Sequence, residues 1–517
     1  MSDAFDQGIT VTEIAAMELP IDVAVETTAA FAGRALRGPL NTPVLINSLA
    51  AFQRRFGGIW HRSCLGPAVQ QFFEHGGSRL YVVRLANNAR GPMIALPATG
   101  GVLVLHALEP GSTENIRAAV DYDDIDEDDD EHFNLVVQRV APDSGFVVDQ
   151  EIFSHLSCNE SSASFIGSAL TTSSIVWAAI PAPHGRPAAT VTDDAGFEIT
   201  YVGHAQRGSD GHELSDYDLI GSSTRGTGIF ALNEVDHFDL LYLPPMARGR
   251  DIGPATVLAA EQYCRRRGAM LVMDPPETWE TPQSAVQGIR NSGYASANIV
   301  GYFPRMTKRH GQQGPSVAVG GALAGLLCKL DRIHGAWEEL DQPGLGISRA
   351  LRPILQLSID DAQLLVREGL NVIAGQAAGR ANVCGSVTMV RGSQMDRKNA
   401  SLTVRRLWLM ITNAIERATR WAVFELDGPR VAERIHGQVD GYMSYLANEG
   451  VFAGDRFVVH CETELRSDTT DPARGITIML AFCPVGANEE ITITLHQTLS
   501  GCRIAATAFA PATIKVA

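Results

Sequence analysis

Residues 236–276, DHFDLLYLPPMARGRDIGPATVLAAEQYCRRRGAMLVMDPP, decide the fold class of this chain. The stretch opens and closes with continuous apolar runs, and between them lies an amphipathic segment that starts near Pro254 and ends at Gly268. Continuous apolar runs are typical of strands buried on both faces, and a Pro and a Gly are usual at the start and end of a helix. The strand–helix–strand order therefore predicts a parallel sheet covered by helices on both faces.

The same alternation continues toward the C-terminus. Residues 281–293 predict a second helix, and residues 296–306 predict a third buried strand. Residues 317–340 predict a further apolar helix, and residues 358–375 predict a capped helix that leads into a strand. We expect these elements to form a central α/β domain over residues 216–395.

Residues 21–88 predict the N-terminal part of the same core. The run IDVAVETT at 21–28 alternates apolar and polar residues as a strand does. LGPAVQQFFEHGG at 65–77 predicts a helix that ends at its glycines, and SRLYVVRL at 78–85 predicts a buried strand.

Residues 89–215 differ from the segments on either side, because they are rich in Gly, Pro and short strands. They predict one inserted β-rich domain. Within it, DYDDIDEDDDE at 121–131 lies between two predicted strands. An EF-hand calcium loop needs a central Gly and a closing Glu at fixed positions, which this stretch lacks, so a solvated hairpin tip is the preferred interpretation.

Residues 396–500 predict a C-terminal α+β domain. Two helices, at 404–425 and 429–450, come before a series of alternating runs. Three strands are predicted from these runs, at 455–464, 475–485 and 489–498. The two chain ends, residues 1–20 and 501–517, also alternate like strands but lie outside the main block, so they predict terminal arms.

Composition limits the classes of function. The chain has 517 residues, 45% hydrophobic and 19% charged, which is enough for about three or four domains. The formal net charge of −16 argues against non-specific nucleic-acid binding. No apolar segment approaches the length of a membrane-spanning helix and no signal peptide is recognisable, so we expect assembly in a cytoplasm without membrane insertion.

No catalytic, cofactor-binding or metal-binding residues are predicted. The sequence has no phosphate-binding loop, no G-x-S-x-G elbow and no H-E-x-x-H, and the Gly-rich segments 221–228 and 320–325 lack the dinucleotide spacing. Asp274, after a predicted strand, is a candidate carboxylate, but an ordinary turn explains it equally well.

The eight cysteines include no C-x-x-C pair, so neither a zinc site nor a thioredoxin motif is expected. Cys328 is predicted to be a core residue on a helix. Cys502 lies near a chain end, and a disulfide to another subunit is open there.

Four motifs in this order resemble contractile phage tail sheath proteins. They are FAGRALRGPLNTPVLINSLAAFQRRFGG at 31–58, AVQQFFEHGGSRLYVVRL at 68–85, AGLLCKLDRIHGAWEEL at 324–340 and VRRLWLMITNAIERATRWAVFE at 404–425. The resemblance covers both ends and the α/β middle, and the inserted domain matches more loosely. Sheaths of phage-like bacteriocins and contractile injection systems are similar as well.

The resemblance implies a structural protein rather than an enzyme. Subunits of this family stack as hexameric rings around an inner tail tube and contract to drive the tube through the host cell envelope. The implied partners are other copies of the chain, the tail tube protein, and baseplate and tail terminator proteins, with no nucleic acid. The implied location is the virion tail, assembled in the bacterial host cytoplasm. The family's central domain is subtilisin-like in shape, but no protease motif accompanies it here.

The resemblance also assigns roles to the arms and to the basic helix. The family's arms add as strands to sheets of neighbouring subunits, although these segments also fit terminal strands of their own subunit. The candidates in the arms are Gly8, Ile9, Val11, Ile14, Ile504, Ala506, Phe509, Ile514 and Val516. The helix at 404–425 faces the tube in the family.

The basic helix has an apolar stripe, from Val404, Leu407 and Trp408 through Ile411 and Ile415 to Ala418 and Ala422. Arg405, Arg406, Arg417 and Arg420 lie mostly off this stripe, and Glu416 is placed to pair with Arg420. A solvated helix face explains them without a partner. With the resemblance, they are expected to hold an acidic tube surface through weak contacts that salt screens.

Two rival functions remain open. An α/β hydrolase or protease needs an exposed nucleophile and a base, for which there is no motif. A sheath of a bacteriocin or an extracellular injection system works in the same way as a phage sheath, so the sequence does not separate them. Secretion-system sheaths commonly split these parts between two proteins, which one long chain disfavours.

Overall fold

The computed structural model describes two compact units. The described residues are 21, 26–190, 200–309, 316–375, 380–390, 400–424, 428–464, 475–485, 487, 489–498 and 501–511. One unit is Glu26–Thr403, and the described residues from Val404 onward form the other. The predicted N-terminal arm, with Gly8, Ile9, Val11 and Ile14, lies outside the described residues, as do Ile514 and Val516.

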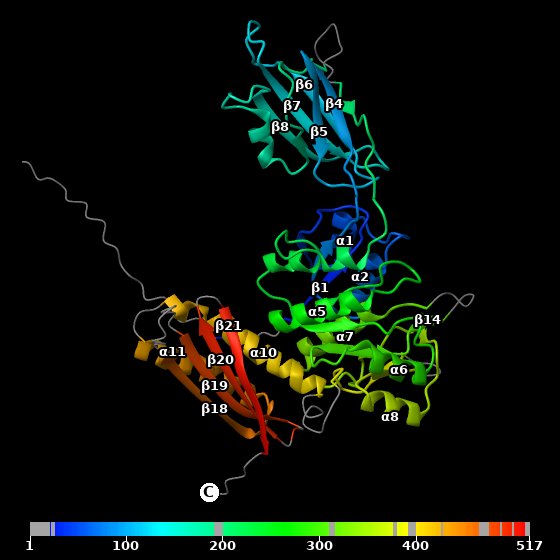
Figure 1. The fold of residues 1–517 in the computed structure, drawn as a ribbon, viewed down its shortest axis with the longest axis vertical. Helices are drawn as coiled ribbons and strands as arrows, with labels where there is room; N and C mark the ends of the chain where they lie inside the picture. The colour runs from blue at the N-terminus through cyan, green and yellow to red at the C-terminus, as the bar shows by residue number, and fades with distance from the viewer. Residues whose placement is uncertain are drawn as a thin grey trace, which may run out of the picture. The chain divides into compact units, whose positions relative to one another are not determined.

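An eight-stranded sheet forms the centre of the first unit (Figure 1). Its order is β17-β16-β13-β12-β11-β1-β3-β2, and the six strands from β16 to β3 are parallel. The two edge strands, β2 and β17, pair antiparallel. The strands are β1 (Thr28–Gly33), β2 (Pro43–Ile46), β3 (Arg79–Arg84), β11 (Leu240–Tyr242), β12 (Met270–Met273), β13 (Ile299–Phe303), β16 (Asn371–Ala374) and β17 (Asn382–Cys384). The parallel sheet predicted from residues 236–276 is confirmed.

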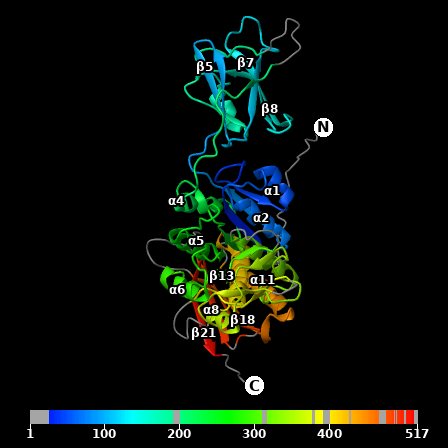
Figure 2. The same cartoon turned by 90° about the vertical axis from the view of Figure 1, so that its right-hand side faces the viewer.

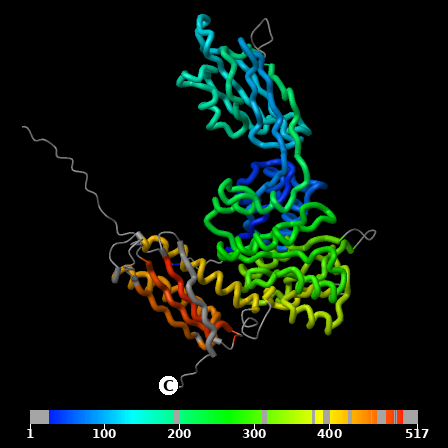
Figure 3. The backbone as a smooth tube through the Cα atoms, viewed as in Figure 1, coloured from blue at the N-terminus to red at the C-terminus, as the bar shows by residue number. Residues whose placement is uncertain are grey.

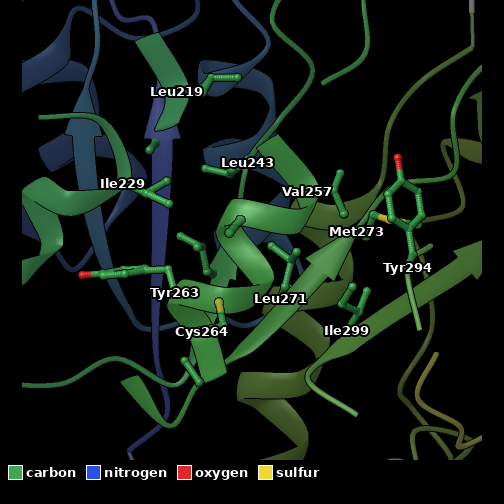
Figure 4. Packing of buried hydrophobic residues seen from close by; sticks show 14 of the residues in the cluster. Leu219, Ile229, Leu243, Val257, Tyr263, Cys264, Leu271, Met273, Tyr294 and Ile299 are labelled. Carbon is green, nitrogen blue, oxygen red and sulfur yellow. The ribbon is translucent and has the colours of Figure 1, made fainter. Parts of the chain in front are cut away.

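Helices flank this sheet and complete its core. They are α1 (Leu49–Phe56), α2 (Leu65–Glu74), α4 (Asp216–Ile220), α5 (Pro254–Arg267), α6 (Pro282–Ser292), α7 (Gly320–Ile333) and α8 (Ile359–Arg367). Figure 4 shows side chains of α5 and of the neighbouring strands packed together, with Val257 and Cys264 near Leu271 and Ile299. The 3-10 helix η2 (Gly228–Glu234) and the small sheet of β14 (Met306–Lys308) and β15 (Leu351–Pro353) complete this part.

The Gly-rich segment 320–325 is the start of α7, and its glycines let two helices approach closely. A Cβ atom at Gly321 would lie 2.4 Å from the Ala68 carbonyl oxygen, and one at Gly325 would lie 2.3 Å from that of Phe72. Both carbonyls belong to α2. These glycines therefore serve helix packing, as in other close backbone contacts.

Two predictions of local structure are wrong in part. Of the described residues in the run 21–28, only Thr28 lies in a strand, and β1 continues to Gly33 through the fully buried TAAFAG. A central parallel strand is apolar on both faces, so the alternating run is the poorer match. The apolar helix predicted at 317–340 is also shorter, because α7 ends at Ile333.

Two antiparallel sheets lie within residues 93–203. One has the order β4-β5-β9 and the other β10-β6-β7-β8, and one apolar cluster contains buried side chains from both. The strands are β4 (Met93–Ala98), β5 (Gly101–Ala107), β6 (Ile116–Asp121), β7 (His132–Val140), β8 (Val147–Ser157), β9 (Val176–Ala178) and β10 (Val202–Gly203), with α3 (Ile166–Ala169) and η1 (Leu170–Thr172) between β8 and β9. Figure 2 shows β5 and β7, one from each sheet, in this β-sandwich.

The second unit pairs helices with a four-stranded antiparallel sheet, in the order β18-β19-β20-β21. Figure 3 follows the chain from α10 through α11 into β18. One face of the sheet is apolar and buried, with Leu480 on β19 and Ile493 on β20. The elements are α10 (Leu402–Thr419), η3 (Arg420–Phe424), α11 (Gly428–Asn448), β18 (Phe452–Glu464), β19 (Gly475–Pro484), β20 (Glu489–Thr498) and β21 (Gly501–Pro511).

Candidate interaction surfaces

The four arginines of the basic helix have different surroundings. Arg417 and Arg420 are exposed, and Arg420 pairs with Glu416 at 3.1 Å, one helical turn away. Arg405 is half-buried, and its guanidinium carbon lies 3.8 Å from the centre of the Trp408 ring. A guanidinium at this distance from an aromatic ring makes a favourable cation–π contact. Arg417 and Arg420 are therefore the two accessible cations among the four.

The prediction that Arg406 belongs to a basic surface of α10 is wrong for the described structure. Its exposed fraction is only 6%, so it is not on an open surface of the described structure. The polar residues Thr412, Asn413 and Thr419 are buried as well, whereas Val404 and Ala418 of the predicted stripe are only half-buried. Packing extends further around α10 than the apolar stripe indicates.

A hydrogen-bonded pair explains why polar residues of α10 can be buried. The Thr419 hydroxyl donates to the side-chain oxygen of Gln497 at 2.5 Å, and the Gln497 amide donates to the Glu416 carbonyl at 3.1 Å. Gln497 lies on β20 and is buried. Buried polar groups need such partners, and these bonds attach the C-terminal turn of α10 to the sheet.

The predicted C-terminal arm forms the last strand of the described sheet. β21 pairs antiparallel with β20, and Ile504, Ala506 and Phe509 have Leu495, Thr494 and Ile491 as register partners. The register shifts between Thr494 and Leu495. β21 is at one end of the strand order and β18 at the other. Cys502 lies in β21, but its side chain is outside the described part, so the inter-subunit disulfide stays a prediction.

Asp274 follows β12 at the edge of the parallel sheet where α/β enzymes hold ligands. Its Oδ2 accepts the Tyr242 hydroxyl at 2.5 Å, and its Oδ1 accepts the backbone N–H groups of Val319 and Gly320 at 3.0 and 2.9 Å. Burial raises the pKa of Asp274, although these hydrogen bonds oppose the change, and burial also raises the pKa of Tyr242. The carboxyl group therefore holds the start of α7.

Arg305 binds a second set of polar groups at the same strand ends. Its guanidinium pairs with Asp251 at 2.7 Å and Glu277 at 3.4 Å, and it donates to the Pro275 carbonyl at 3.2 Å. Burial opposes its charge, but the hydrogen bond to Asp251 and the nearby carboxylates outweigh burial and raise its pKa. The half-buried Cys64 thiol has its pKa raised, chiefly by burial, which is the wrong direction for a nucleophile.

Arg84 is a structural residue that the sequence did not single out. It is buried at the end of β3 and donates to the carbonyl oxygens of Ala35, Leu36, Gly38 and Pro110 at 2.6–3.2 Å. Burial lowers its pKa to about 10. Arg84 lies within SRLYVVRL at 78–85, a motif that predicts only a buried strand. The sequence therefore did not indicate that its side chain binds four carbonyl oxygens.

The acidic stretch 121–131 joins β6 to β7, which pair as a hairpin, and most of its residues are exposed. Asp129 accepts the backbone N–H groups of His132 and Glu131, and these bonds lower its pKa to about 2. Nowhere in the described part of the chain do three His, Cys, Asp or Glu side chains gather to hold a metal ion. The solvated hairpin tip is the interpretation that fits.

Cys328 is buried on α7, as predicted.

Among the described helices, none is long and apolar enough to cross a membrane.

Comparison with protein-family models finds no match, and comparison with curated proteins finds none. Solved structures do match. A sheath tail protein from Listeria innocua has 15% identity and a TM-score of 0.61, with 91% of this chain and 94% of that chain covered. The contracted sheath of the anti-feeding prophage has 14% identity, a TM-score of 0.53, and coverage of 93% and 96%.

A third similar structure is the contracted PVC sheath complex of an extracellular contractile injection system. It has 14% identity and a TM-score of 0.52, with 94% of this chain and 95% of that chain covered. At such identities the likeness establishes the fold, and in these structures it is the fold of sheath proteins. The resemblance first noticed in four sequence motifs is confirmed at the level of the fold.

Proposed function

We propose that this chain is the structural subunit of a contractile tail sheath. It polymerises as stacked hexameric rings around an inner tail tube and contracts to drive the tube through the host cell envelope. The observation that carries this proposal is the likeness of fold to sheath proteins over more than nine tenths of the chain. The internal use of Asp274 and Arg305 supports a structural rather than an enzymatic role.

The contact with the tube is assigned to the outward side of α10. Arg417 and Arg420 are the exposed cations there, and Arg405 contributes beside Trp408. Exposed ion pairs contribute about 0–1 kcal/mol each and weaken with salt. Several such contacts would hold an acidic tube surface in register and still release it when the sheath contracts.

The terminal strands link neighbouring subunits in this proposal. In the described chain β21 occupies the place beside β20, with ten paired residues. A neighbour's strand with the same sequence would make the same main-chain hydrogen bonds, so exchange between subunits changes few contacts. Such links would hold subunits together while their bodies move. Residues 8–14 and Ile514 and Val516 are assigned to the same linkage.

The free energy for contraction would come from an extended lattice that is metastable. The net charge of −16 makes subunits repel one another, so local complementary contacts must hold the extended state. A contracted state with larger buried interfaces would release a small free energy for each subunit, summed along the rings.

The full chain, mixed with a tail tube protein, tests the proposal. Negative-stain microscopy should show sheathed tubes with sixfold rings. Dispersed monomers in the presence of tubes would overturn it. For α10, Arg417→Glu with Arg420→Glu should abolish co-sedimentation with tubes, whereas Arg265→Glu with Arg266→Glu on α5 makes the same change of charge and should retain it.

The alternative is a sheath of a phage-like bacteriocin or an extracellular injection system. The likeness to the PVC and anti-feeding prophage sheaths favours it as much as a phage tail. A capsid gene beside the coding gene would decide for a phage. A hydrolase-type enzyme is the remaining rival, and turnover of an ester or peptide probe by dispersed chain would support it.

A further inference from the structure

The negative charge of this chain lies almost entirely in one segment. Residues 89–215 contain 20 acidic and five basic residues, a net charge of −15 in a chain whose total is −16. Residues 27–73 show the opposite, with five arginines and no acidic residue or lysine. Opposite charges on separate parts of one chain favour contacts between unlike parts of neighbouring copies, because like parts repel each other.

The basic segment folds into one surface at the end of α1. The backbone N–H of Arg37 donates to the Phe56 carbonyl at 3.3 Å, and its guanidinium donates to the Arg54 carbonyl at 3.0 Å. A Cβ atom at Gly57 would lie 3.4 Å from the Arg37 side chain. The loop after β1 therefore lies against the last turn of α1, which brings Arg37 and the exposed Arg54 together.

The turn that follows α1 extends this surface. The guanidinium carbons of Arg34 and Arg62 lie 4.8 and 5.8 Å from the centre of the Trp60 ring, and Arg62 is exposed. Ile59, between α1 and Trp60 in the chain, is 53% exposed. An exposed apolar residue among cations offers a partner both an apolar contact and charge. We call Arg37, Arg54, Ile59 and Arg62 the α1 surface.

Carboxylates near the α1 surface have partners of their own. Glu109 pairs with Arg55 at 2.7 Å and accepts the Gly38 N–H at 2.9 Å. Asp210 accepts the backbone N–H and the hydroxyl of Ser112, both at 2.8 Å. Within the described residues, the arginines of the α1 surface form no ion pair. Their positive charge is therefore available to a partner.

Internal hydrogen bonds hold the acidic hairpin tip between β6 and β7 in shape. Asp129 Oδ1 accepts the backbone N–H groups of Glu131 and His132 at 2.9 and 3.0 Å. The Asn134 side-chain amide donates to Asp121 Oδ1 at 2.8 Å. A tip that is already ordered loses little conformational freedom when it binds a partner.

Four other carboxylates of this tip are open to a partner. Asp124, Asp126, Glu127 and Asp128 are exposed, and their side chains form no hydrogen bond or ion pair within the described structure. Nine of the 11 residues at 121–131 are acidic, the densest run of carboxylates in the chain. Like charges gathered in this way repel one another, and a cationic partner relieves the repulsion. We call these four residues the acidic tip.

The acidic tip lies at the end of the β-sandwich away from the core. β4 starts at Met93, soon after the chain enters the β-sandwich from the core, and ends at Ala98. Ala98 pairs with Pro187, whose carbonyl accepts the Tyr122 hydroxyl at 2.6 Å. β4 separates these two ends by roughly 17 Å, at about 3.4 Å for each residue. The tip is therefore directed away from the α1 surface of its own chain, so contact between the two needs a second copy.

We propose that the acidic tip of one copy binds the α1 surface of a neighbouring copy. The occupant is assigned by charge, because the α1 surface fits an acidic partner and every neighbour presents a preformed set of unpaired carboxylates. In a stacked array the tips are held at high local concentration, so weak contacts that salt screens suffice. The inference rests on the proposed function and identifies one complementary contact between subunits that otherwise repel each other.

Charge reversal with rescue tests the contact on full-length chain polymerised with tail tube protein. Arg54→Glu with Arg62→Glu reverses the α1 surface, and Asp126→Lys with Asp128→Lys reverses the acidic tip. Each pair alone should raise the concentration of chain needed for polymerisation about tenfold. The chain with all four changes should recover most of this loss, because the contact is then restored with its charges exchanged.

The matched control is Asp143→Lys with Glu160→Lys. Both residues are exposed in the β-sandwich outside the tip, and the change of net charge is the same. This pair should leave polymerisation unchanged and should not rescue Arg54→Glu with Arg62→Glu. Equal rescue by the control would mean that only the net charge matters, which would overturn the contact. Unchanged thermal unfolding of each variant excludes loss of the fold as the cause.

Cross-linking gives a second, independent readout. Glu127→Cys and Arg54→Cys chains are mixed, polymerised and treated with a short bismaleimide. Dimers should form in the mixture and not with either variant alone, which controls for native cysteines such as Cys384. Glu160→Cys in place of Glu127→Cys should give no dimers.

The outcomes separate the contact from the proposed function. Sheathed tubes that show neither cross-links nor an effect of charge reversal would overturn the contact and leave the proposed function standing. A loss at the α1 surface that the chain with all four changes fails to recover would assign this surface to another acidic partner and also overturn the contact. Failure of the unmodified chain to polymerise would count against the proposed function itself.

Discussion

At the carboxyl ends of the central parallel strands, Asp274 is half-buried and Arg305 is buried, and both are bonded to several partners. On the outward side of α10, Arg417 and Arg420 are exposed. The first region is where α/β enzymes place ligands, yet here its charged groups hold α7 and the neighbouring loops. A charged residue at a typical active-site position can thus be engaged in holding the fold, while the charges of the surface helix stay exposed.

The largest effect is expected from Asp274→Ala. The change leaves the Tyr242 hydroxyl and the N–H groups of Val319 and Gly320 without their acceptor. Each buried donor without a partner costs about 1–3 kcal/mol, so the free energy of unfolding should fall by about 3 kcal/mol or more. Urea denaturation measures it. Asp274→Asn, which keeps an acceptor for the helix, should lose clearly less, and equal losses would contradict the role assigned to Asp274.

Arg305→Met comes next. It removes the partner of Asp251 and Glu277, whose side chains are 24% and 34% exposed. Breaking a fully buried pair costs about 3–5 kcal/mol, and the partial exposure of these carboxylates reduces the expected loss to about 2 kcal/mol. The same denaturation experiment applies. A variant as stable as the parent would show that this cluster does not hold the strand ends.

The buried residue His75 should make the stability of the fold depend on pH. Its Nε2 accepts the Ser348 N–H at 2.9 Å and its Nδ1 lies 2.7 Å from the Gln71 carbonyl oxygen, so the ring is neutral in the fold. Burial lowers its pKa below the ordinary histidine value of 6.5. The unfolded chain then binds more protons just below pH 6.5, and stability falls as the pH drops through this value, by at most about 1.4 kcal/mol per pH unit.

The variant His75→Gln isolates this contribution. Unfolding measured at pH 7 and pH 5 should show a smaller loss of stability in His75→Gln than in the parent chain. Parallel losses in the two proteins would mean that other groups carry the pH dependence.

The smallest effect on stability is expected on α10. Arg417→Gln with Arg420→Gln removes exposed charges and one pair with Glu416, so the free energy of unfolding should change by no more than about 0.5 kcal/mol. Binding to tubes should nevertheless weaken, and co-sedimentation at increasing salt measures this. A large loss of stability would erase the distinction between the two regions.

Much of the fold was predictable because its causes are local. The runs at 240–243 and 270–273 are continuously apolar, and the helices next to them start with Pro and end with Gly. Such a pattern specifies buried parallel strands without reference to distant parts of the chain. Ser358 caps α8 as its position predicts, since its hydroxyl accepts the Asp361 N–H. The strand predicted at 21–28 was the exception, because the described strand β1 begins at Thr28 and runs through the buried TAAFAG.

The surfaces were less predictable. Alternation along β4, β5 and β9 does not say whether the second face is covered, and that depends on the core that the two sheets share. A helical period likewise identifies one buried stripe on α10 but not what packs beside that stripe. Arg406 was therefore predicted to be on the same surface as Arg417, although it is buried.

The sequence by itself determined the order of strands and helices, the parallel sheet and the likeness to sheath proteins, because apolar spacing and glycine positions act over a few residues. Only the tertiary structure decided which charges are used internally and which remain exposed. Asp274 meets the start of α7, and Gln497 meets Thr419, across 46 and 78 residues of chain. Contacts over such separations depend on how whole elements pack, which no local pattern encodes.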